Sequence, residues 1–483
     1  MSEQALQIGI FVFITALIGL LTWWKCRGAA PKDSDSSDDS REQFLAGGDL
    51  SWVYVAGSIT LTNLSTDQLV GMNGSQMLLL AWWELAAVAG LAILALVFLP
   101  IYYRYGCTTT TELLERRYGD KNIRAVIGAL FLLGNVFLSL PIMLYTGSLF
   151  MQSMFGVQAP LLAIAAAFAV VGAAYAVLGG LRAVAVSDTY SGVGLLAMAL
   201  LVVYLALQAI GFDLSDIPAE RLTLIGDSDS PIPWPTLLTG MIFIQIFYWS
   251  TNQTITQRAM ASPSLAEAQK GVAVAGLIRL LIVPAIVVIP GICAYKLYGD
   301  IGDAAYGRLV GELLPGWLSG TFAAFIAAAV LTSYNSVLNS SATLYVCDLH
   351  ETYIAAKPNI PRLNAIITAA FVVLSLALVP VYAGADSIIN LVQQLYGLLS
   401  MPILSVFIVG LLFRKVAPGA AILQVVFGTA LYAVFTFVWT PLHYIHLMLI
   451  TLGMTIGMGL LANRLLFGQW AEYAGLEALR RSG

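Results

Sequence analysis

Two short polar segments interrupt long apolar runs and carry the residue types most able to bind a ligand. The first runs from Thr62 to Gln68, and the second runs from Ala329 to Ser336. Polar groups are costly in hydrocarbon, where no water satisfies them, so they persist where they line a cavity or bind something. A helix broken at that depth exposes backbone carbonyls, and hydroxyls that face them complete an oxygen cage for a small hard cation. The two segments together predict a cation site.

The spacing within the second segment defines one face of this cage. Ala329 lies three and four residues before Thr332 and Ser333, so its carbonyl and their hydroxyls share one face of a helix. The broken helix opposite would contribute the carbonyls of Leu61 and Leu64. An uncharged oxygen cage suits sodium better than calcium or magnesium, which prefer several carboxylates. The alternative is that both hydroxyls bond back to the preceding helical turn.

Glu84 and Arg279 each place a charge inside an apolar run. An unpaired charge there costs at least about 2.5–3.5 kcal/mol, so each must face a polar cavity or a partner. In one interpretation, Glu84 accepts and Arg279 donates hydrogen bonds to a polyhydroxylated solute. The residues that would complete the ring around the solute are Gln68, Gln245 and Gln393. In the other interpretation, the two charges form a structural ion pair that holds the helices together.

Asp188 opens a further apolar run, shortly after the sequence from Gly179 to Arg182. Its carboxylate would hold a second cation or relay sodium inward, together with Asn335 and Ser336. An equally direct interpretation is that it caps the N-terminus of a helix.

Residue patterns typical of enzymes and primary pumps are absent from the sequence. His443 and His446 lie three residues apart without a third metal ligand, and there is no Walker-type glycine loop, nucleophile elbow or paired His/Cys site. The four cysteines show neither metal-ligand spacing nor a disulfide framework. A net charge of -4 without a basic stripe argues against nucleic acid as a partner. We therefore expect a protein that is not an enzyme and binds no nucleic acid.

The elements that must position these residues are membrane-spanning helices. The chain of 483 residues is 59% apolar and 10% charged, with a mean hydropathy of +0.84, whereas a soluble domain carries about 25% charged residues. The apolar runs predict an all-α polytopic membrane protein with about 13 transmembrane helices, which makes the lipid bilayer a partner. The expected spans are 5–24, 52–76, 78–103, 124–154, 160–179, 187–211, 235–254, 270–297, 318–346, 362–383, 387–413, 418–439 and 442–466.

The basic residues predict the orientation of these spans. Most of the 23 lysines and arginines fall in loops and helix ends on one side of the arrangement, which is the cytoplasmic side by the positive-inside rule. The exceptions are Arg221, Lys296 and Arg308 on the other side and Arg279 within a span. We therefore expect a multi-pass protein of the cell (inner) membrane with its N-terminus outside and its C-terminus cytoplasmic.

Two spans with polar interruptions predict an internal repeat. Span 52–76 carries the first polar segment, and five spans later span 235–254 carries Gln245 and the polar residues 248–253. An odd offset inverts the second unit relative to the first, which predicts a five-plus-five inverted repeat. The expected organisation is an N-terminal transmembrane helix at 1–27, a polar cytoplasmic linker at 28–50, a transporter core at 51–415 divided into 51–212 and 234–415, and two C-terminal transmembrane helices with a short cytoplasmic tail at 416–483.

Several motifs resemble those of the sodium/solute symporter family, and within it the sodium/glucose cotransporters. In chain order, the matching stretches are Phe44–Gly47, Asn63–Gly71, Gly179–Ala183, Tyr248-Trp249, Asn252-Gln253, Gln257-Arg258, Glu267–Gly271 and Leu338–Thr343. They cover about three quarters of the chain. The resemblance implies a leucine-transporter-like core, sodium as the coupling ion and a small polar solute, a sugar, as the cargo.

The resemblance also implies roles for individual residues. The family's sodium site falls on the carbonyls of Leu61, Leu64 and Ala329 and the hydroxyls of Thr332 and Ser333. Its sugar contacts fall on Gln68, Glu84, Gln245, Arg279 and Gln393, with Tyr248 as an aromatic floor over the inner exit. Met72, Trp83 and Ile389 would form an apolar outer gate.

Four positions depart from the sugar-carrier pattern. Arg279 stands where lysine is expected, Gln245 replaces a smaller polar residue, Ala87 replaces a serine and Ile389 replaces an aromatic residue. We expect a sodium-coupled symporter that imports a monosaccharide or related polyol. Because a guanidinium grips carboxylates bidentately, a symporter for an amino acid, sialic acid or other organic anion is the alternative. A substrate-gated channel or sensor without coupled transport is a third possibility.

Overall fold

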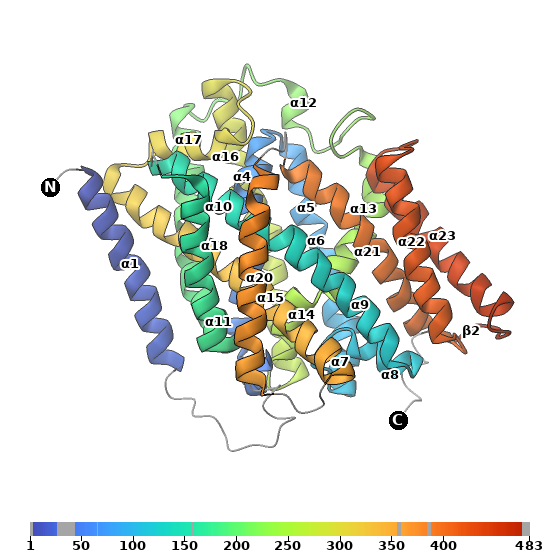
Figure 1. Ribbon diagram of the computed structural model, residues 1–483. Helices are drawn as coiled ribbons and strands as arrows, with labels where there is room; N and C mark the ends of the chain where they lie inside the picture. The colour runs from blue at the N-terminus through green and yellow to red at the C-terminus, as the bar shows by residue number, and fades with distance from the viewer. Residues whose placement is uncertain are drawn as a thin grey trace.

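The computed structural model describes residues 3–26, 44–64, 66–155, 159–354, 359–383 and 388–475. Most of the expected linker at 28–50 and the end of the expected tail therefore lie outside the described residues. The described chain is a single bundle of helices packed side by side (Figure 1). This architecture confirms an all-α fold.

The first half of the chain combines short helical pieces with longer helices. The elements are α1 (Glu3–Cys26), η1 (Ala46–Gly48), α3 (Trp52–Asn63), α4 (Thr66–Gly74), η2 (Leu78–Ala81), α5 (Trp82–Leu85), α6 (Ala87–Ile93), η3 (Leu94–Phe98), α7 (Leu99–Tyr105), α8 (Glu112–Tyr118), α9 (Lys121–Gly134), η4 (Asn135–Ser139), α10 (Leu140–Phe155), α11 (Leu161–Ala209) and α12 (Ala219–Leu222).

The second half repeats this mixture of broken and continuous helices and ends in a hairpin of two helices. The elements are η5 (Trp234–Leu238), α13 (Gly240–Ile246), η6 (Phe247–Thr251), α14 (Gln253–Met260), α15 (Leu265–Leu281), α16 (Val283–Tyr298), α17 (Ala304–Leu313), α18 (Gly316–Thr343), η7 (Leu344–His350), α19 (Glu351–Tyr353), α20 (Ile360–Tyr382), α21 (Ile388–Leu412), β1 (Phe413–Arg414), α22 (Pro418–Phe437), α23 (Tyr444–Leu465) and β2 (Glu472–Tyr473). Strands β1 and β2 pair antiparallel.

Ten helical stretches of the described chain are long and apolar enough to cross a membrane, which confirms a polytopic membrane protein. The expected spans missing from these ten are 52–76, 160–179 and 235–254. Two of them are broken: the first into α3 and α4, the last into η5, α13, η6 and α14. The remaining one belongs to α11.

α11 is a single element of 49 residues where we expected two spans. A straight helix of that length would extend about 74 Å, more than twice the thickness of a hydrocarbon core. Both halves nevertheless contact the same stretch of α18, because Gly172 lies against Tyr334 and Asp188 lies near Thr332. The two halves of α11 therefore lie beside the same part of α18, as two separate membrane crossings would.

The two broken spans have corresponding interruptions. α3 ends at Asn63 and is followed by Leu64, whose φ of -80° and ψ of 72° are not helical; α4 begins at Thr66. η6 ends before Asn252, whose φ of -70° and ψ of 120° are extended, and α14 begins at the next residue. Asn252 caps the new helix, since its side chain accepts a hydrogen bond from the backbone N–H of Thr254 at 2.9 Å. Each repeat thus opens with an interrupted helix.

α18 is the most enclosed long helix among the described residues and faces the first interruption. It packs against α1, α10, α11 and α3, and its residues from Thr332 to Thr343 are buried. α3 in turn packs between α11 and α15. This packing brings the two polar segments of the sequence to the same place.

Candidate functional site

A cavity of about 130 Å³ lies beside the break between α3 and α4. One water needs about 10–15 Å³ of such volume, so the cavity has room for a small organic solute. The predicted residues that line it are Gln68, Met72, Trp83, Glu84, Gln245 and Tyr248. The other lining residues are Thr62, Asn63, Ser139, Ile142, Met143, Ile244, Trp249, Val392 and Tyr396. The side chains of the predicted Ile389 and Gln393 lie outside the described residues, although Val392 of the same helix α21 lines the wall.

Glu84 and Arg279 form an ion pair behind one wall of this cavity. Arg279 Nη1 donates to Glu84 Oε2, and Nη2 donates to the carbonyl of Thr60 at 3.1 Å. The two side chains are 1% and 0% exposed, and the guanidinium lies 4.5 Å from the ring centre of Trp249. Glu84 lines the cavity, whereas Arg279 does not. The structure therefore pairs the two predicted charges and separates Arg279 from the cavity by its partner.

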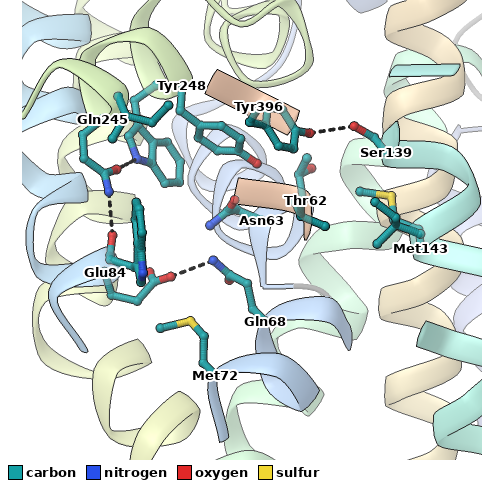
Figure 2. A pocket seen from close by; sticks show the side chains of 15 residues that line it. Thr62, Asn63, Gln68, Met72, Glu84, Ser139, Met143, Gln245, Tyr248 and Tyr396 are labelled. Atoms are coloured by element: carbon teal, nitrogen blue, oxygen red, sulfur yellow. Dashed lines mark hydrogen bonds between the residues drawn. The ribbon is translucent and has the colours of Figure 1, made fainter. Parts of the chain in front are cut away.

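Gln68 and Asn63 extend this pair into a polar wall (Figure 2). Gln68 Nε2 donates to Glu84 Oε1 at 2.8 Å. With its amide oriented to satisfy both ends, Asn63 accepts from the two terminal nitrogens of Arg279 at 2.8 and 2.9 Å and donates to the hydroxyl of Tyr248 at 2.6 Å. One connected network thus reaches from α15 through the α3–α4 break to η6.

Gln245 is held in place by two partners. Its Nε2 donates to the carbonyl of Trp83 at 3.0 Å, and its Oε1 accepts from the indole N–H of Trp249 at 2.8 Å. Because Trp249 stacks on Arg279, Gln245 positions the ring that covers the guanidinium. Its Nε2 also lies 3.9 Å from Met241 Sδ, so the hydrogen-bonding capacity that Gln245 retains is the second lone pair of Oε1.

Ser139 and Tyr396 face the network from the other side of the cavity. Their hydroxyls form a hydrogen bond of 2.6 Å, as Figure 2 shows. Sequence analysis missed both residues, because a single serine or tyrosine in an apolar span carries no motif. Ser139 ends the π-helical turn η4, and such turns are frequent at functional sites, but they cannot be read from sequence. Asn63 and Trp249 belong to the motifs that resemble the symporter family, but the resemblance implies no role for either residue.

The residues of the predicted sodium cage lie where α18 meets the end of α3. Ser333 Oγ lies 3.5 Å from the carbonyl oxygen of Leu61 and 3.3 Å from that of Thr62. Thr332 Oγ1 bonds back to the carbonyl of Ala329 at 3.2 Å, which matches the alternative interpretation for that hydroxyl. Both hydroxyl residues are buried. The structure thus places buried oxygens from two helices beside the break at Leu64.

Asp188 lies within the interior of α11, so it does not cap a helix N-terminus. Its carboxylate accepts a hydrogen bond from Ser58 Oγ, which also accepts from Arg258 Nε at 2.8 Å. Ser336 Oγ bonds the carbonyl of Thr332 at 2.6 Å and lies 3.3 Å from Thr62 Oγ1. Asn335 is buried one residue before it. These groups form a second polar cluster that adjoins the predicted cage.

Known proteins share the sequence pattern of this chain. The pattern of the sodium:solute symporter family matches residues 43–428. An uncharacterized symporter of Escherichia coli strain K12, YidK, is 34% identical over 446 residues, which cover 86% of this chain and 76% of the relative. The sodium/glucose cotransporter of Vibrio parahaemolyticus is 30% identical over 454 residues, 86% of this chain and 82% of the relative.

A solved structure shares the fold. It shows a Na⁺-coupled sialic acid symporter in a substrate-bound outward-open state, with a TM-score of 0.81 and 18% sequence identity, and the match covers 95% of this chain and 98% of the other. At this identity the likeness shows the fold alone. It confirms the leucine-transporter-like core that the family resemblance implied.

Proposed function

Because the chain belongs to the sodium:solute symporter family, we propose that it imports a monosaccharide or related polyol together with sodium by alternating access. The family consists of sodium-coupled transporters rather than enzymes. The proposal therefore concerns the class of solute, the residues that hold solute and sodium, and the direction of the chain through the membrane.

The charge balance of the cavity is the observation that carries this proposal. Among the described lining residues, Glu84 is the one charged side chain, and its partner Arg279 is buried behind it. An anionic solute would meet a carboxylate and no unpaired cation. A neutral polyol meets hydrogen-bonding groups from Glu84, Gln68 and the Ser139–Tyr396 pair, and the rings of Trp83 and Tyr248 can cover its apolar faces.

The geometry at the helix break suggests how sodium would prepare this cavity. We assign the ion to the carbonyls of Leu61, Leu64 and Ala329 and to the hydroxyls of Thr332 and Ser333. An ion there ties the end of α3 to α18 and restrains Thr62 and Asn63, which follow Leu61 in the sequence. Asn63 belongs to the cavity network. Sodium would therefore order the solute site before the solute arrives.

The remaining predicted residues complete a transport cycle in this proposal. Met72, Trp83 and Ile389 close the outer side once the solute is bound, and Tyr248 moves to open the inner side. Asp188, with Asn335 and Ser336, offers oxygens along the path by which sodium leaves. Solute binding favours closure because it makes contacts in the closed state that are absent from the open one.

We also propose that the N-terminus lies outside and the C-terminus is cytoplasmic, with 51–415 as the transport core. In Figure 1, α8 lies on the side of the bundle opposite to α12 and α17. α8 carries Arg116 and Arg117, whereas the loop that precedes α12 is acidic. Impermeant labelling of cysteines introduced at Asp216 and at Arg116 in intact cells should modify the first and spare the second; the reverse would invert the topology.

The test of solute class is transport by the purified protein in proteoliposomes. Labelled neutral sugars and polyols are compared with sugar acids and amino acids, each with sodium or with choline outside. We expect sodium-dependent uphill uptake of a neutral polyol, inhibited by neutral competitors. Uptake inhibited by anions alone would identify a carboxylated solute, and binding without uphill accumulation would identify a sensor or channel.

A further inference from the structure

A second cavity lies on the outer surface of the bundle, between α3, α11 and α15. Its volume is about 170 Å³, and its lining is apolar apart from two threonines. Val53 and Val193 form its rim and are 43% and 68% exposed. α11 and α15 contribute to candidate membrane spans, so this cavity opens toward the hydrocarbon of the bilayer. We call it the lipid-facing groove.

Small residues explain why the helices leave a hollow here. A Cβ on Gly57 of α3 would lie 2.5 Å from Thr189 Oγ1 of α11, so the two helices touch at this level. Beyond that contact, Gly192 leaves space in front of Leu61. Ile278 of α15 forms part of the opposite wall. The groove is therefore built into the helix packing, and it does not share a lining residue with the central cavity.

A cation and an aromatic ring mark one end of the groove. Trp52, at the start of α3, lines it, and Lys270 Nζ of α15 lies 4.1 Å from the centre of the Trp52 ring. Glu267 accepts from the backbone N–H of Trp52 at 3.0 Å, and within the described chain Lys270 has no ion pair. Tryptophan and lysine together are typical of the membrane–water interface, where the ammonium extends toward head groups.

A second exposed lysine lies near the same end. Lys25 closes α1 and is close to Tyr190 of α11, next to the groove residue Thr189. A lipid phosphate at this end would lie beside Lys270, while the other end of the groove remains apolar. The charge distribution matches one ligand chemistry, an apolar chain that carries an anionic head group.

We propose that the lipid-facing groove binds one acyl chain of an anionic phospholipid, with the phosphate at Lys270. The bilayer supplies this ligand at high local concentration, and the groove offers the chain contact on three sides. Leu61 connects the lipid-facing groove with the proposed sodium site, since the residue lines the groove and its carbonyl faces Ser333. A bound chain thus packs against the last turn of α3 before the break.

Photo-labelling in vesicles tests the position of the acyl chain without requiring transport. The protein is reconstituted in phosphatidylcholine with phosphatidylglycerol that carries a photoreactive group near its acyl end, and labelled peptides are mapped by mass spectrometry. We expect labels concentrated on 53–61, 189–196 and 274–278. Val193→Trp should fill the groove and remove them. Val373→Trp, at an equally exposed valine of α20 (68%), should leave them unchanged.

Competition with unlabelled lipid tests the head group. One lysine near the surface contributes about fivefold to the binding of an anionic lipid. Phosphatidylglycerol should therefore compete at least about fivefold better than phosphatidylcholine, and Lys270→Gln should reduce the difference about fivefold. Lys121→Gln is the control, because Lys121 also lies over an aromatic ring, that of Tyr353 at 5.0 Å, away from the groove.

Three results would overturn the proposal. Labels spread evenly over all lipid-exposed helices would indicate ordinary boundary lipid. Equal competition by both lipids would remove the phosphate assignment. Dissociation of a dimer by Val193→Trp, with the labelled positions changing only as a result, would identify a second copy of the chain as the occupant of the groove. None of these outcomes depends on the solute or on sodium, so they are distinguishable from failure of the proposed function.

Discussion

Arg279 brings a permanent charge into the helix bundle, and Glu84 is the group that compensates it. Removing one partner of a buried ion pair leaves the other charge uncompensated, which typically costs 3–5 kcal/mol. Loss of uptake in a Glu84 variant would therefore have two causes, instability of the protein and loss of a solute contact. A second substitution separates them.

Glu84→Gln should lower the free energy of unfolding by about 3–5 kcal/mol and abolish uptake. Glu84→Gln combined with Arg279→Gln should regain most of the stability, because no charge is left unpaired, while uptake stays absent. Thermal unfolding in detergent and uptake in proteoliposomes give the two readouts. Wild-type uptake by the double variant would show that the pair is structural only.

Ser333→Ala removes the hydroxyl that faces the carbonyls of Leu61 and Thr62. Loss of one buried oxygen contact worth about 1–1.5 kcal/mol should raise the sodium concentration for half-maximal uptake about tenfold. Ser341→Ala is the matched control, because Ser341 is buried on the same helix and, among the described residues, its hydroxyl bonds only back to Val337 at 2.7 Å. Unchanged sodium activation in Ser333→Ala would remove the hydroxyl from the proposed cage.

At the scale of the elements, the interrupted helices determine where polar groups meet. α3 ends at Asn63 and η6 ends before Asn252. After the first break, Gln68 and Met72 of α4 line the cavity. The sequence predicted both interruptions, because polar residues with poor helix propensity stand within apolar spans. It did not predict the π-helical turns η4 and η6, since these depend on how neighbouring helices pack.

Asn252→Ala tests the second interruption. Losing the cap of α14 should cost about 1 kcal/mol of stability, and uptake should fall several-fold because α14 then begins at a less defined position. Asn359→Ala removes a similar cap, on the N–H of Arg362 at 3.1 Å at the start of α20, and should cost similar stability without affecting uptake. Equal uptake in both variants would argue against a role for this break in transport.

At the scale of the whole molecule, Figure 1 shows α1 at one edge of the bundle and α22 with α23 at the other. The broken helices, the cavity and the polar clusters lie between them. Coupled transport requires this central region to change its conformation, and the sodium gradient supplies the free energy for accumulation. One sodium that moves down about 100 mV and a tenfold gradient supplies roughly 2.3 and 1.4 kcal/mol, together enough for about 500-fold accumulation.

The membrane potential should therefore control accumulation in proteoliposomes. With a tenfold sodium gradient and one ion per solute, the plateau should fall from about 500-fold at 100 mV to about tenfold at zero potential. Two ions per solute would give about 100-fold at zero potential. Accumulation is measured with labelled solute, and the membrane potential is set by a potassium gradient with a potassium-selective ionophore. A plateau that never exceeds the external concentration would exclude coupled import.

The sequence was sufficient for properties that depend on composition and local pattern. Apolar runs identified the membrane protein, and polar residues within spans identified the broken helices and part of the cavity wall. Gln68, Glu84, Gln245 and Tyr248 were predicted from the residues and motifs, and the structure places all of them on one cavity. The spans and their interruptions are local properties, because each follows from the residues of a single span. The grouping of these four residues, which lie in three spans, came from the charges within spans and from the family resemblance.

The tertiary structure alone decided which side chains are partners. It placed Arg279 behind Glu84 instead of on the cavity wall, engaged Gln245 with Trp249, and joined Ser139 to Tyr396 across the bundle. It also opened the lipid-facing groove between three helices. The physical reason is that such contacts depend on how each helix is rotated and tilted against its neighbours. Rotation and tilt are set by packing among residues far apart in the chain, so the sequence of a single span does not determine them.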